Sequence, residues 1–447
     1  MPAHSERHNF ILPRFARADC IIASIVLAAL AIRAAWLLRS GSEWAVATDS
    51  IGYLALAHGI REGCGFAAMA IGCGAPEVLR TPGYPLFLVP FLNHYRLAIF
   101  VQAVFGAAVC GVVAAFTKRR YGAAAAIVAA AIVAFDPPTI TVTKELLTEP
   151  LFQLLLAGAV FGSLCNRALA AGLLYGAAAL VRPVAEPLLI LAPVPFLLSR
   201  RWIRATGALC LPLVMLGAWA ARNYRVAGVF ALTIEGPMNL YSYTVPAVVS
   251  LATGVPLIEA QRAAAHAVES AGFGDRGDLI ARARELSPHD EISWAVEKSP
   301  AVVKLMLSRS IHVIASHPIA TAEVTAIGFL RLAFEPHAPA VGLAKMVNGG
   351  GPAFRLVKIG SMVLEATLLC FVWIGVARAM FVYSRDDQLR ILLSVGLLLL
   401  LAASPYFDVF DPRYRVPAIP FLATIAGVGW ANLVKLGRKQ DEIESNG

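Results

Sequence analysis

The sequence predicts an all-α polytopic membrane protein with about ten transmembrane helices. Three observations support this fold class. The chain of 447 residues is 58% hydrophobic and 15% charged, whereas soluble domains are about 45–50% apolar and about 25% charged. Nearly charge-free windows of roughly 20 residues recur along it, the length needed to cross about 30 Å of hydrocarbon. Their apolar residues are continuous rather than alternating, so we expect helices instead of barrel strands.

The ten expected spans are identified from hydropathy and from the basic residues beside them. Basic runs such as Lys118-Arg119-Arg120 and Arg200-Arg201 fall on connections that the positive-inside rule places in the cytoplasm, together with both termini. These positions also explain the net charge of +9, so nucleic-acid binding is not expected. The first span is too long for a signal peptide and lacks a small-residue cleavage site, so we expect it to be retained. The spans lie near 18–38, 97–117, 121–141, 149–165, 168–181, 184–198, 205–221, 356–382, 388–404 and 415–435.

The spans divide the chain into three parts. Residues 1–221 are expected to form an N-terminal transmembrane module of seven spans, with a first periplasmic loop at 39–96. Residues 222–355 are too polar to insert as a whole and are expected to form a periplasmic and interfacial helical segment. Residues 356–447 are expected to form a C-terminal transmembrane module of three spans and a short cytoplasmic tail.

Helical periodicity continues inside the middle part. Residues 259–272 and 291–316 carry apolar residues at helical spacing. Residues 319–334 are apolar but contain Glu323 and Arg331. A span there would move the following basic residues to the outer side, so we expect an interfacial helix instead.

Unusual polar residues recur at the outer ends of the expected spans. Arginine binds phosphate bidentately and keeps its charge when partly desolvated. A carboxylate at the same place can take a proton from an incoming hydroxyl group. We therefore expect one site at the membrane surface, for a phosphate-linked substrate whose lipid tail stays in the bilayer. The residues are Asp49, Tyr53, Arg80, Tyr84, Lys144, Glu145, Glu149, Arg182, Arg222, Asn223, Arg413, Tyr414 and Arg415.

Simpler structural roles stay open for these residues. An arginine at a span end can extend to lipid phosphates without taking part in a site. Asp49 can cap a helix, because it stands among residues that all favour caps. Glu186 and Glu365 lie in apolar surroundings, where we expect structural hydrogen bonds.

Cysteine and metal chemistry leave few signals. Cys64 and Cys73 share one polar loop and can form a disulfide if that loop is periplasmic, with free thiols as the alternative. The other cysteines lie in or beside apolar spans, where we expect packing roles. No histidine or cysteine motif typical of a metal site occurs. No cofactor is predicted, and a divalent cation held by Asp49 and a second carboxylate is left open.

Four groups of motifs follow one another between residues 18 and 435. They are Asp49-Ser50-Ile51-Gly52-Tyr53 with Arg80-Thr81-Pro82-Gly83-Tyr84, then Lys144-Glu145 and Thr148-Glu149-Pro150 with Val181-Arg182-Pro183, then Trp219 with Arg222-Asn223-Tyr224, and finally Asp411-Pro412-Arg413-Tyr414-Arg415. The order and placement of these motifs resemble those of the C-type glycosyltransferase superfamily (GT-C). The sequence resembles in particular the branch of the protein O-mannosyltransferases and lipid A aminoarabinose transferases, which is glycosyltransferase family 39-like.

The resemblance implies an enzyme that moves a hexosyl or pentosyl group from a polyprenyl-phosphate donor to a hydroxyl acceptor. The reaction would take place at the periplasmic face of the bacterial inner membrane, with Asp49 as the catalytic base or as the group that orients the acceptor. Ser50 stands where family members often carry a second carboxylate, and the aminoarabinose branch has an acidic residue in the loop that contains Arg80. The donor phosphate would be held by Arg80, Lys144, Arg182, Arg222 and Arg413.

Two other functions fit the sequence. A flippase or other transporter of lipid-linked glycans also handles such lipids, but transporters place charges near the bilayer midplane and often carry inverted repeats. Here the charges gather at one face and no repeat is visible. A polysaccharide polymerase or ligase also uses polyprenyl-linked donors, with a pyrophosphate carrier. The expected partners are a polyprenyl-phosphate sugar, membrane lipid and a protein, lipid or glycan acceptor, and no motif identifies the sugar or the acceptor.

Overall fold

A computed structural model of the chain describes residues 14–39, 48–67, 76–269, 300–336, 352–404 and 411–445. These residues form helices joined by short connections, and the only β-structure among them is an isolated bridge between Ala67 and Pro76. The chain is an all-α protein, as predicted. The helices are α1 (Arg14–Arg39), α2 (Thr48–Arg61), α3 (Gly83–Leu88), η3 (Val89–Phe91), α4 (Tyr95–Tyr121), α5 (Ala123–Phe135), α6 (Pro137–Thr141), η4 (Val142–Lys144), α7 (Glu149–Leu164), α8 (Ala168–Val181), η5 (Pro183–Ile190), α9 (Val194–Leu198), α10 (Trp202–Ala227), α11 (Glu235–Asn239), η6 (Leu240–Thr244), α12 (Val245–Thr253), α13 (Leu257–Glu269), α16 (Pro300–Ser316), α17 (Pro318–Phe334), α19 (Pro352–Val382), α20 (Asp387–Ala403), η7 (Pro412–Ala418) and α21 (Ile419–Ser445).

Each of the ten expected spans coincides with helical structure. Five of the described helices are individually long and apolar enough to cross a membrane, and two bent pairs would raise this number to seven. The pairs are Ala123–Phe135 with Pro137–Lys144, bent by 55°, and Val302–Ser316 with Pro318–Phe334, bent by 101°. The chain is therefore a multi-pass membrane protein, while the count of ten spans stays a prediction.

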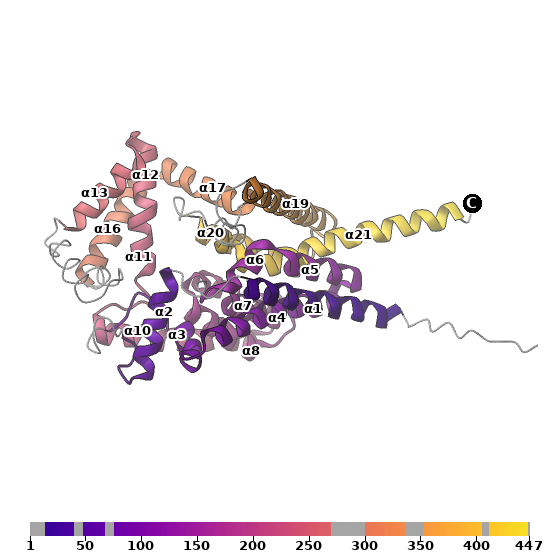
Figure 1. Cartoon of the computed structure of the whole chain (residues 1–447), viewed down its shortest axis with the longest axis horizontal. Helices are drawn as coiled ribbons and strands as arrows, with labels where there is room; N and C mark the ends of the chain where they lie inside the picture. The colour runs from indigo at the N-terminus through magenta and orange to yellow at the C-terminus, as the bar shows by residue number, and fades with distance from the viewer. Residues whose placement is uncertain are drawn as a thin grey trace, which may run out of the picture.

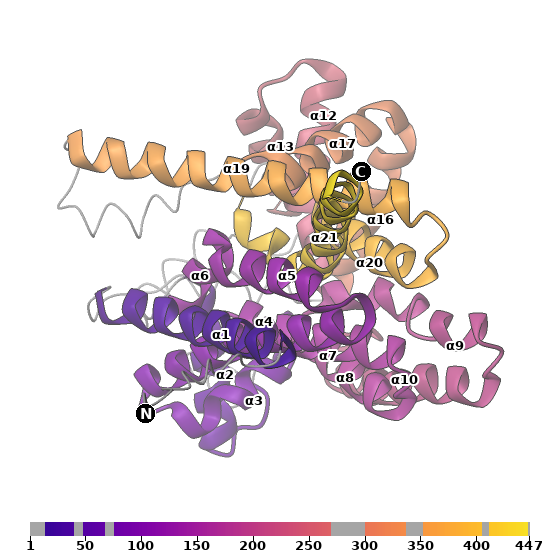
Figure 2. The same cartoon turned by 90° about the vertical axis from the view of Figure 1, so that its right-hand side faces the viewer.

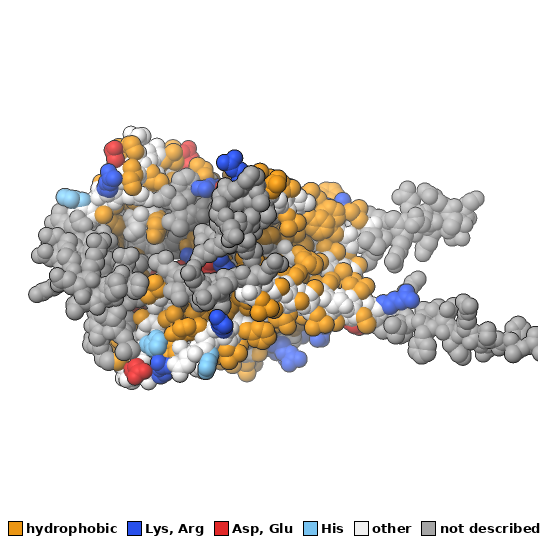
Figure 3. Space-filling model, viewed as in Figure 1, with side chains coloured by type: hydrophobic (Ala, Val, Ile, Leu, Met, Phe, Trp, Pro, Cys, Tyr) orange, Lys and Arg blue, Asp and Glu red, His pale blue; other side chains and the backbone are white. Residues whose placement is uncertain are grey.

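The helices form two groups in Figure 1. Helices α1, α4, α5 and α21 run along the long axis as a bundle, and α11, α12, α13 and α16 gather at one end, which is called the outer end below. Helix α1 begins and α21 ends at the opposite end (Figure 1). Hydrophobic side chains cover most of the described surface of the bundle on the face shown in Figure 3. This arrangement suits a bundle in lipid with its two ends in water, and the cytoplasmic position of the termini stays a prediction.

The C-terminal helices cross at very short range. Helix α19 lies across α21 (Figure 2), and the rings of Phe371 and Trp430 stack with their centroids 4.5 Å apart. A Cβ atom on Gly429 would lie 1.9 Å from the carbonyl oxygen of Gly375. Glycine is therefore required at residue 429, because any side chain would separate the two backbones.

A buried arginine on α1 supplies hydrogen-bond donors to the carbonyls at the outer end of α5. Arg33 on α1 is fully buried and donates hydrogen bonds to the carbonyls of Val133 and Ala134, at 3.3 and 3.4 Å. These carbonyls belong to the last turn of α5, where a helix has no donor of its own for them. The Asp136 side chain then caps α6. The chain thus turns at the outer end of the bundle and leads into residues 144–149.

Helix α10 is longer than the sequence predicted. It continues past residue 221 to Ala227 and ends at Gly228, which takes the left-handed φ of 69° common at helix C-termini. No proline lies between Pro212 and this glycine, and the single Gly217 does not interrupt the helix, so it extends into the expected periplasmic segment.

The middle part is helical where it is described. The segments expected at 259–272, 291–316 and 319–334 correspond to α13, α16 and α17, and residues 270–299 lie outside the described residues. The bend of 101° between α16 and α17 shows that they do not form one straight span. The interfacial position of α17 stays a prediction.

Candidate active site

Five charged side chains meet near the outer end of the bundle, and each lies at a helix terminus. Asp49 is in the first turn of α2, Arg80 precedes α3, Glu149 begins α7, Arg182 directly follows α8 and Arg413 lies in η7. A proline stands within two residues of every member except Asp49. Proline starts helices but cannot continue a preceding one, so the chain breaks at these points and exposes the neighbouring side chains at the helix ends.

Residues next to these five join their segments to one another. Three such hydrogen bonds connect Ser50 Oγ with the Leu146 carbonyl at 3.0 Å, Thr81 Oγ1 with the Val181 carbonyl at 3.1 Å, and Gln153 Nε2 with the Val416 carbonyl at 2.6 Å. The hydroxyl of Ser50 therefore has a structural contact at the position where the resembled family often carries a carboxylate. These bonds fix the relative positions of α2, α7, α8 and η7.

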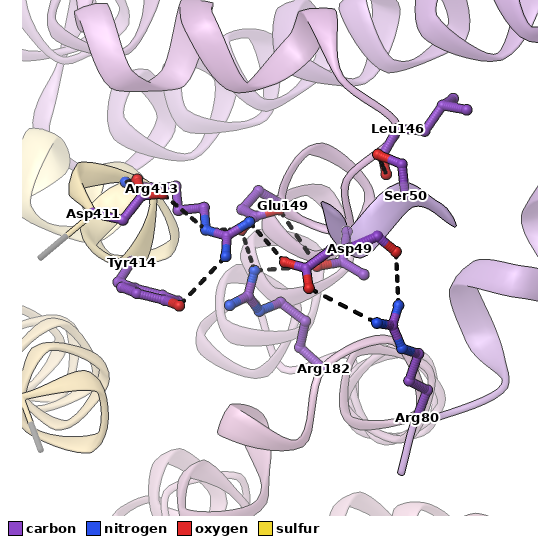
Figure 4. Close-up of polar contacts among 10 residues, drawn as sticks. Asp49, Ser50, Arg80, Leu146, Glu149, Arg182, Asp411, Arg413 and Tyr414 are labelled. Atoms are coloured by element: carbon purple, nitrogen blue, oxygen red, sulfur yellow. Dashed lines mark hydrogen bonds and ion pairs between the residues drawn. The ribbon is translucent and has the colours of Figure 1, made fainter. Parts of the chain in front are cut away.

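Asp49 is held between two guanidinium groups. Its Oδ2 lies 2.9 Å from Nη1 of Arg413, and its Oδ1 lies 3.8 Å from Nη2 of Arg80 (Figure 4). Arg80 also donates to the main-chain carbonyl of Asp49 at 2.7 Å, and its guanidinium lies 4.6 Å from the ring centroid of Tyr53. The Asp49 side chain is 40% exposed, so the paired carboxylate still borders open space.

Glu149 is the second carboxylate of the cluster and is only 1% exposed. It forms an ion pair with Arg182, and Arg413 Nε lies 3.9 Å from its Oε1 (Figure 4). Arg182 also donates to the hydroxyl of Thr148 at 3.1 Å. Arg413 thus contacts Asp49 and Glu149 at the same time and links the two carboxylates.

Two neighbours hold Arg413 in place. Asp411 lies 3.1 Å from Arg413 Nε and accepts a hydrogen bond from the Arg413 backbone N–H at 2.9 Å. Arg413 Nη2 donates to the hydroxyl of Tyr414 at 3.4 Å, and its guanidinium lies 5.2 Å from the centroid of that ring. The guanidinium is therefore surrounded by fixed groups while it remains 20% exposed.

The cluster borders a cavity of about 600 Å³, within the usual range of about 300–1,000 Å³ for small-molecule sites. One wall is apolar and comes from residues such as Leu399, Ala402 and Ala403 of α20 and Pro187 of η5. The other walls carry most of the charge, with three arginines against four carboxylates. The charged residues are Arg80, Arg182, Arg413, Asp49, Glu149, Glu186 and Glu235, and Tyr53 and Tyr414 lie beside them.

Two accessible carboxylates of the cavity, Asp49 and Glu235, differ in their electrostatic surroundings. Burial alone would raise the pKa of Asp49, but Arg413 and Arg80 outweigh it and hold this pKa below its usual value. Burial raises the pKa of Glu235, and the positive charges of Arg182 and Arg80 offset only part of that effect. One cavity therefore contains one carboxylate that stays ionised and another that holds its proton more readily.

Arg222 and Asn223 do not line this cavity, which corrects their expected contact with the substrate. Arg222 donates to the carbonyls of Glu77 and Phe66, at 2.5 and 2.9 Å. The side-chain amide of Asn223 donates to the carbonyls of residues 231 and 232, at 2.9 and 3.0 Å. The end of α10 thus joins the segments that precede Arg80 and Glu235, because α10 extends further than its hydropathy predicted.

Three more predicted residues also point elsewhere. Lys144 is buried and lies 3.6 Å from the carboxylate of its neighbour Glu145. The Tyr84 hydroxyl donates to the side-chain carbonyl of Gln102. None of these residues lines the cavity, and their polar groups meet partners inside the helix bundle.

Arg415 is the remaining correction. It is 2% exposed, forms an ion pair with Glu365 on α19 and donates to the Glu335 carbonyl at 2.9 Å. In the 3₁₀ turn that contains it, Arg415 points away from Arg413. The structural role expected for Glu365 is therefore an ion pair between α19 and η7.

Glu186, for which we expected a structural hydrogen bond, also lines the cavity. Glu235 is the charged cavity residue that sequence reasoning did not single out at all. It lies in the outer segment, away from any span end. Neither hydropathy nor a neighbouring helix-breaking residue therefore distinguishes it from surface carboxylates. Thr233-Ile234-Glu235 follows the loop after α10, and only the contacts of that loop bring Glu235 to the cavity.

The cysteine and metal predictions have different outcomes. Cys64 is disulfide-bonded, and its expected partner Cys73 lies outside the described residues. No group of three or more His, Cys, Asp or Glu residues converges as metal ligands within the described part of the chain. The Asp49 oxygens contact guanidinium groups instead, so these residues do not fit a divalent cation.

Known proteins offer only distant likenesses. No protein-family model and no functionally curated protein matches the chain. Among solved structures it is similar to the archaeal oligosaccharyltransferase AglB from Archaeoglobus fulgidus, in complex with an inhibitory peptide and a dolichol-phosphate, with 13% identity and a TM-score of 0.47. That likeness covers 97% of this chain and 52% of the archaeal one, so this chain spans about half the length of that protein.

The chain is also similar to ArnT from Cupriavidus metallidurans. The structure bound to undecaprenyl phosphate has 16% identity and a TM-score of 0.39, over 93% of this chain and 78% of that one. The apo structure has 15% identity and a TM-score of 0.36, over 92% and 78% of the two chains. At these identities and TM-scores the likenesses decide neither fold nor function, which rest on the geometry above.

Proposed function

We propose that this chain is a GT-C glycosyltransferase that moves a sugar from a polyprenyl-phosphate donor to a hydroxyl acceptor at the periplasmic face of the membrane. One observation carries the proposal. Three arginines and the Asp49 carboxylate face a single cavity that also has an apolar wall, at the outer end of a membrane bundle. A lipid-linked sugar phosphate needs a cationic site, room for a sugar and contact with lipid in the same place.

The guanidinium groups of the cavity support binding of a phosphate. Arg80, Arg182 and Arg413 pair with carboxylates, yet all three also line the cavity. Each guanidinium has five N–H donors, so it can share them between its carboxylate and the phosphate of a sugar-phosphate-lipid diester. Guanidinium groups placed before the substrate arrives can also stabilise the charge that develops on the departing phosphate.

The proposed reaction is a displacement at the anomeric carbon. The acceptor oxygen forms a bond to this carbon, the bond from the carbon to the phosphate oxygen breaks, and polyprenyl phosphate leaves with the electron pair. The hydroxyl proton passes to a carboxylate of the cavity. Asp49, kept ionised by Arg413 and Arg80, orients the acceptor hydroxyl and stabilises positive charge on the sugar ring.

The test uses purified protein in lipid nanodiscs with a panel of undecaprenyl-monophosphate hexoses and pentoses, each offered with a total lipid and protein extract as acceptor. Release of undecaprenyl phosphate is measured by mass spectrometry. Turnover is expected with at least one monophosphate donor, and Asp49→Asn should abolish it while the melting temperature stays unchanged. Turnover restricted to diphosphate donors would instead indicate a polymerase or ligase. Movement of labelled lipid across the membrane without bond cleavage would indicate a flippase.

A further inference from the structure

Glu235 is accessible to a substrate in the cavity and, unlike the neighbouring Asp49 and Glu149, forms no salt bridge within the described residues. It lines the cavity, whose walls separate it from bulk water, and its side chain still faces the open space within the cavity. Asp49 and Glu149 each contact arginines, whereas within the described residues Glu235 makes no salt bridge. Its carboxylate is therefore open to a group that enters the cavity.

The backbone around Glu235 is rigidly attached to the segment that carries Arg80. The Thr233 hydroxyl donates to the Leu79 carbonyl, and the Ile234 N–H donates to the Val78 carbonyl at 3.1 Å. The Glu235 N–H in turn donates to the Thr233 hydroxyl oxygen at 3.0 Å. Because residues 78 and 79 directly precede Arg80, the Glu235 side chain is held at a fixed place beside the phosphate-binding groups.

We propose that Glu235 is the general base that removes the proton from the acceptor hydroxyl during sugar transfer. This assignment rests on the function proposed above and completes its proton balance: as the acceptor oxygen bonds to the anomeric carbon, its proton moves to the Glu235 carboxylate. The phosphate oxygen keeps the electron pair of the broken bond. Asp49 then orients and stabilises charge but does not bind the proton.

The surroundings of the two carboxylates favour this division of roles. Asp49 is held by Arg413 and Arg80, so protonating it would forfeit two favourable charge contacts. Burial raises the pKa of Glu235, which makes it the stronger base near neutral pH. Two carboxylates whose pKa values are pushed apart within one site are the usual arrangement for separate acid–base and electrostatic roles. The charged and titratable groups around Glu235 are Arg182, Arg80, Arg413, Asp49 and Tyr53.

Glu259 provides a matched comparison outside the cavity. It is a glutamate of the same outer segment, in the first turn of α13, and its side chain is exposed. It does not line the cavity. A general loss of negative charge from the outer segment would affect both glutamate variants, whereas loss of the base would affect only the variants of Glu235.

The experiment compares Glu235→Gln, Glu235→Asp and Glu259→Gln in nanodiscs, with an undecaprenyl-monophosphate sugar that the wild type turns over. Glu235→Gln should lower kcat by about 10²–10⁴-fold, the usual contribution of a general base. Its Kd for undecaprenyl phosphate should stay within about threefold of the wild type, Glu235→Asp should keep measurable activity, and Glu259→Gln should stay within about threefold in kcat. Near-normal turnover by Glu235→Gln, or an equal loss in Glu259→Gln, would overturn the assignment. Absence of turnover in the wild type would instead count against the proposed function itself.

A second measurement compares the protonation of Glu235 with the pH dependence of the activity. A hydrophobic carbodiimide reacts with protonated carboxyl groups, and peptide mass spectrometry reports the labelled fraction of Glu235 as a function of pH. A base must be ionised to act, so kcat/KM should rise with pH through the pKa of Glu235, above the usual 4.5 for glutamate, while labelling falls over the same range. Labelling that has already ended below that usual value, or that falls in a different pH range from the rise in activity, would overturn the assignment.

Discussion

Arginines inside the cavity and arginines in the interfaces around it have different partners. In the cavity, Arg80, Arg182 and Arg413 contact carboxylates and border open space. In the neighbouring interfaces, Arg33 and Arg222 donate to main-chain carbonyls, and Arg415 pairs with a carboxylate that is itself buried. Arg33 lies inside the first expected span, whereas Arg222 and Arg415 lie beside span ends, as the cavity arginines were expected to, so their position in the sequence does not distinguish these two from the cavity arginines.

The difference has a physical consequence for anion binding. Backbone carbonyls belong to packed helices and loops, so a guanidinium that they hold is fixed away from the cavity. A guanidinium paired with a carboxylate at an open cavity can share its donors with an incoming phosphate. The partner of an arginine together with its access to the cavity, rather than its place at a span end, therefore identifies a binding group.

The largest effect is expected where an interface arginine carries a buried charge. Arg415→Ala would remove the guanidinium that pairs with Glu365, a carboxylate that is only 1% exposed. We expect a loss of about 3–5 kcal/mol in the free energy of unfolding, measured in detergent. A double variant with Arg415→Met and Glu365→Leu should recover most of it, since apolar residues can replace a buried ion pair. Wild-type stability of the single variant would contradict the structural role.

A cavity arginine should affect the reaction instead of the fold. Arg413→Ala removes a guanidinium that contacts Asp49, while Asp49 keeps Arg80 and Glu149 keeps Arg182. Turnover is expected to fall by about 10²–10³-fold, as when one pre-placed group is lost from a transition-state site. The melting temperature should stay close to that of the wild type. Arg413→Lys is the control, because it keeps the charge without the planar fork and should give intermediate activity.

The smallest effect is expected for the interface arginine next to the cavity. Arg222→Gln loses the bonds to the carbonyls of Glu77 and Phe66 and loosens the segment that carries Arg80. We expect kcat to fall by about tenfold through misplacement of groups in the cavity. A loss as large as that of Arg413→Ala, accompanied by weaker lipid binding, would show that Arg222 contacts the donor after all.

The sequence was sufficient for the helices and for part of the cluster. Long apolar windows and flanking basic residues indicate helices because each signal is local to its segment. Arg80, Glu149, Arg182 and Arg413 stand beside prolines that break helices, and the structure brings these four to Asp49. Their proximity could be anticipated because the breaks all fall at the same expected membrane face.

The remaining residues depended on packing between distant segments. Whether Arg222 faces a cavity or a loop depends on how far α10 continues, and that is decided by Gly228 together with the loop against which the helix packs. Arg415 follows Arg413 by two residues, and the turn of η7 directs the two guanidinium groups to different partners. Glu235 reaches the cavity through hydrogen bonds to residues 78 and 79, which no pattern within its own segment reveals.

Binding of undecaprenyl phosphate to nanodisc-embedded protein tests most directly whether the cavity arginines hold a lipid phosphate. The dissociation constant would be measured for the wild type, Arg413→Ala and Arg222→Gln under identical salt conditions. We predict that Arg413→Ala binds at least about tenfold more weakly, the effect of losing roughly one charge-assisted contact, and that Arg222→Gln stays within about threefold of the wild type. Equal affinities for all three proteins would contradict the phosphate site, and with it the proposed sugar transfer.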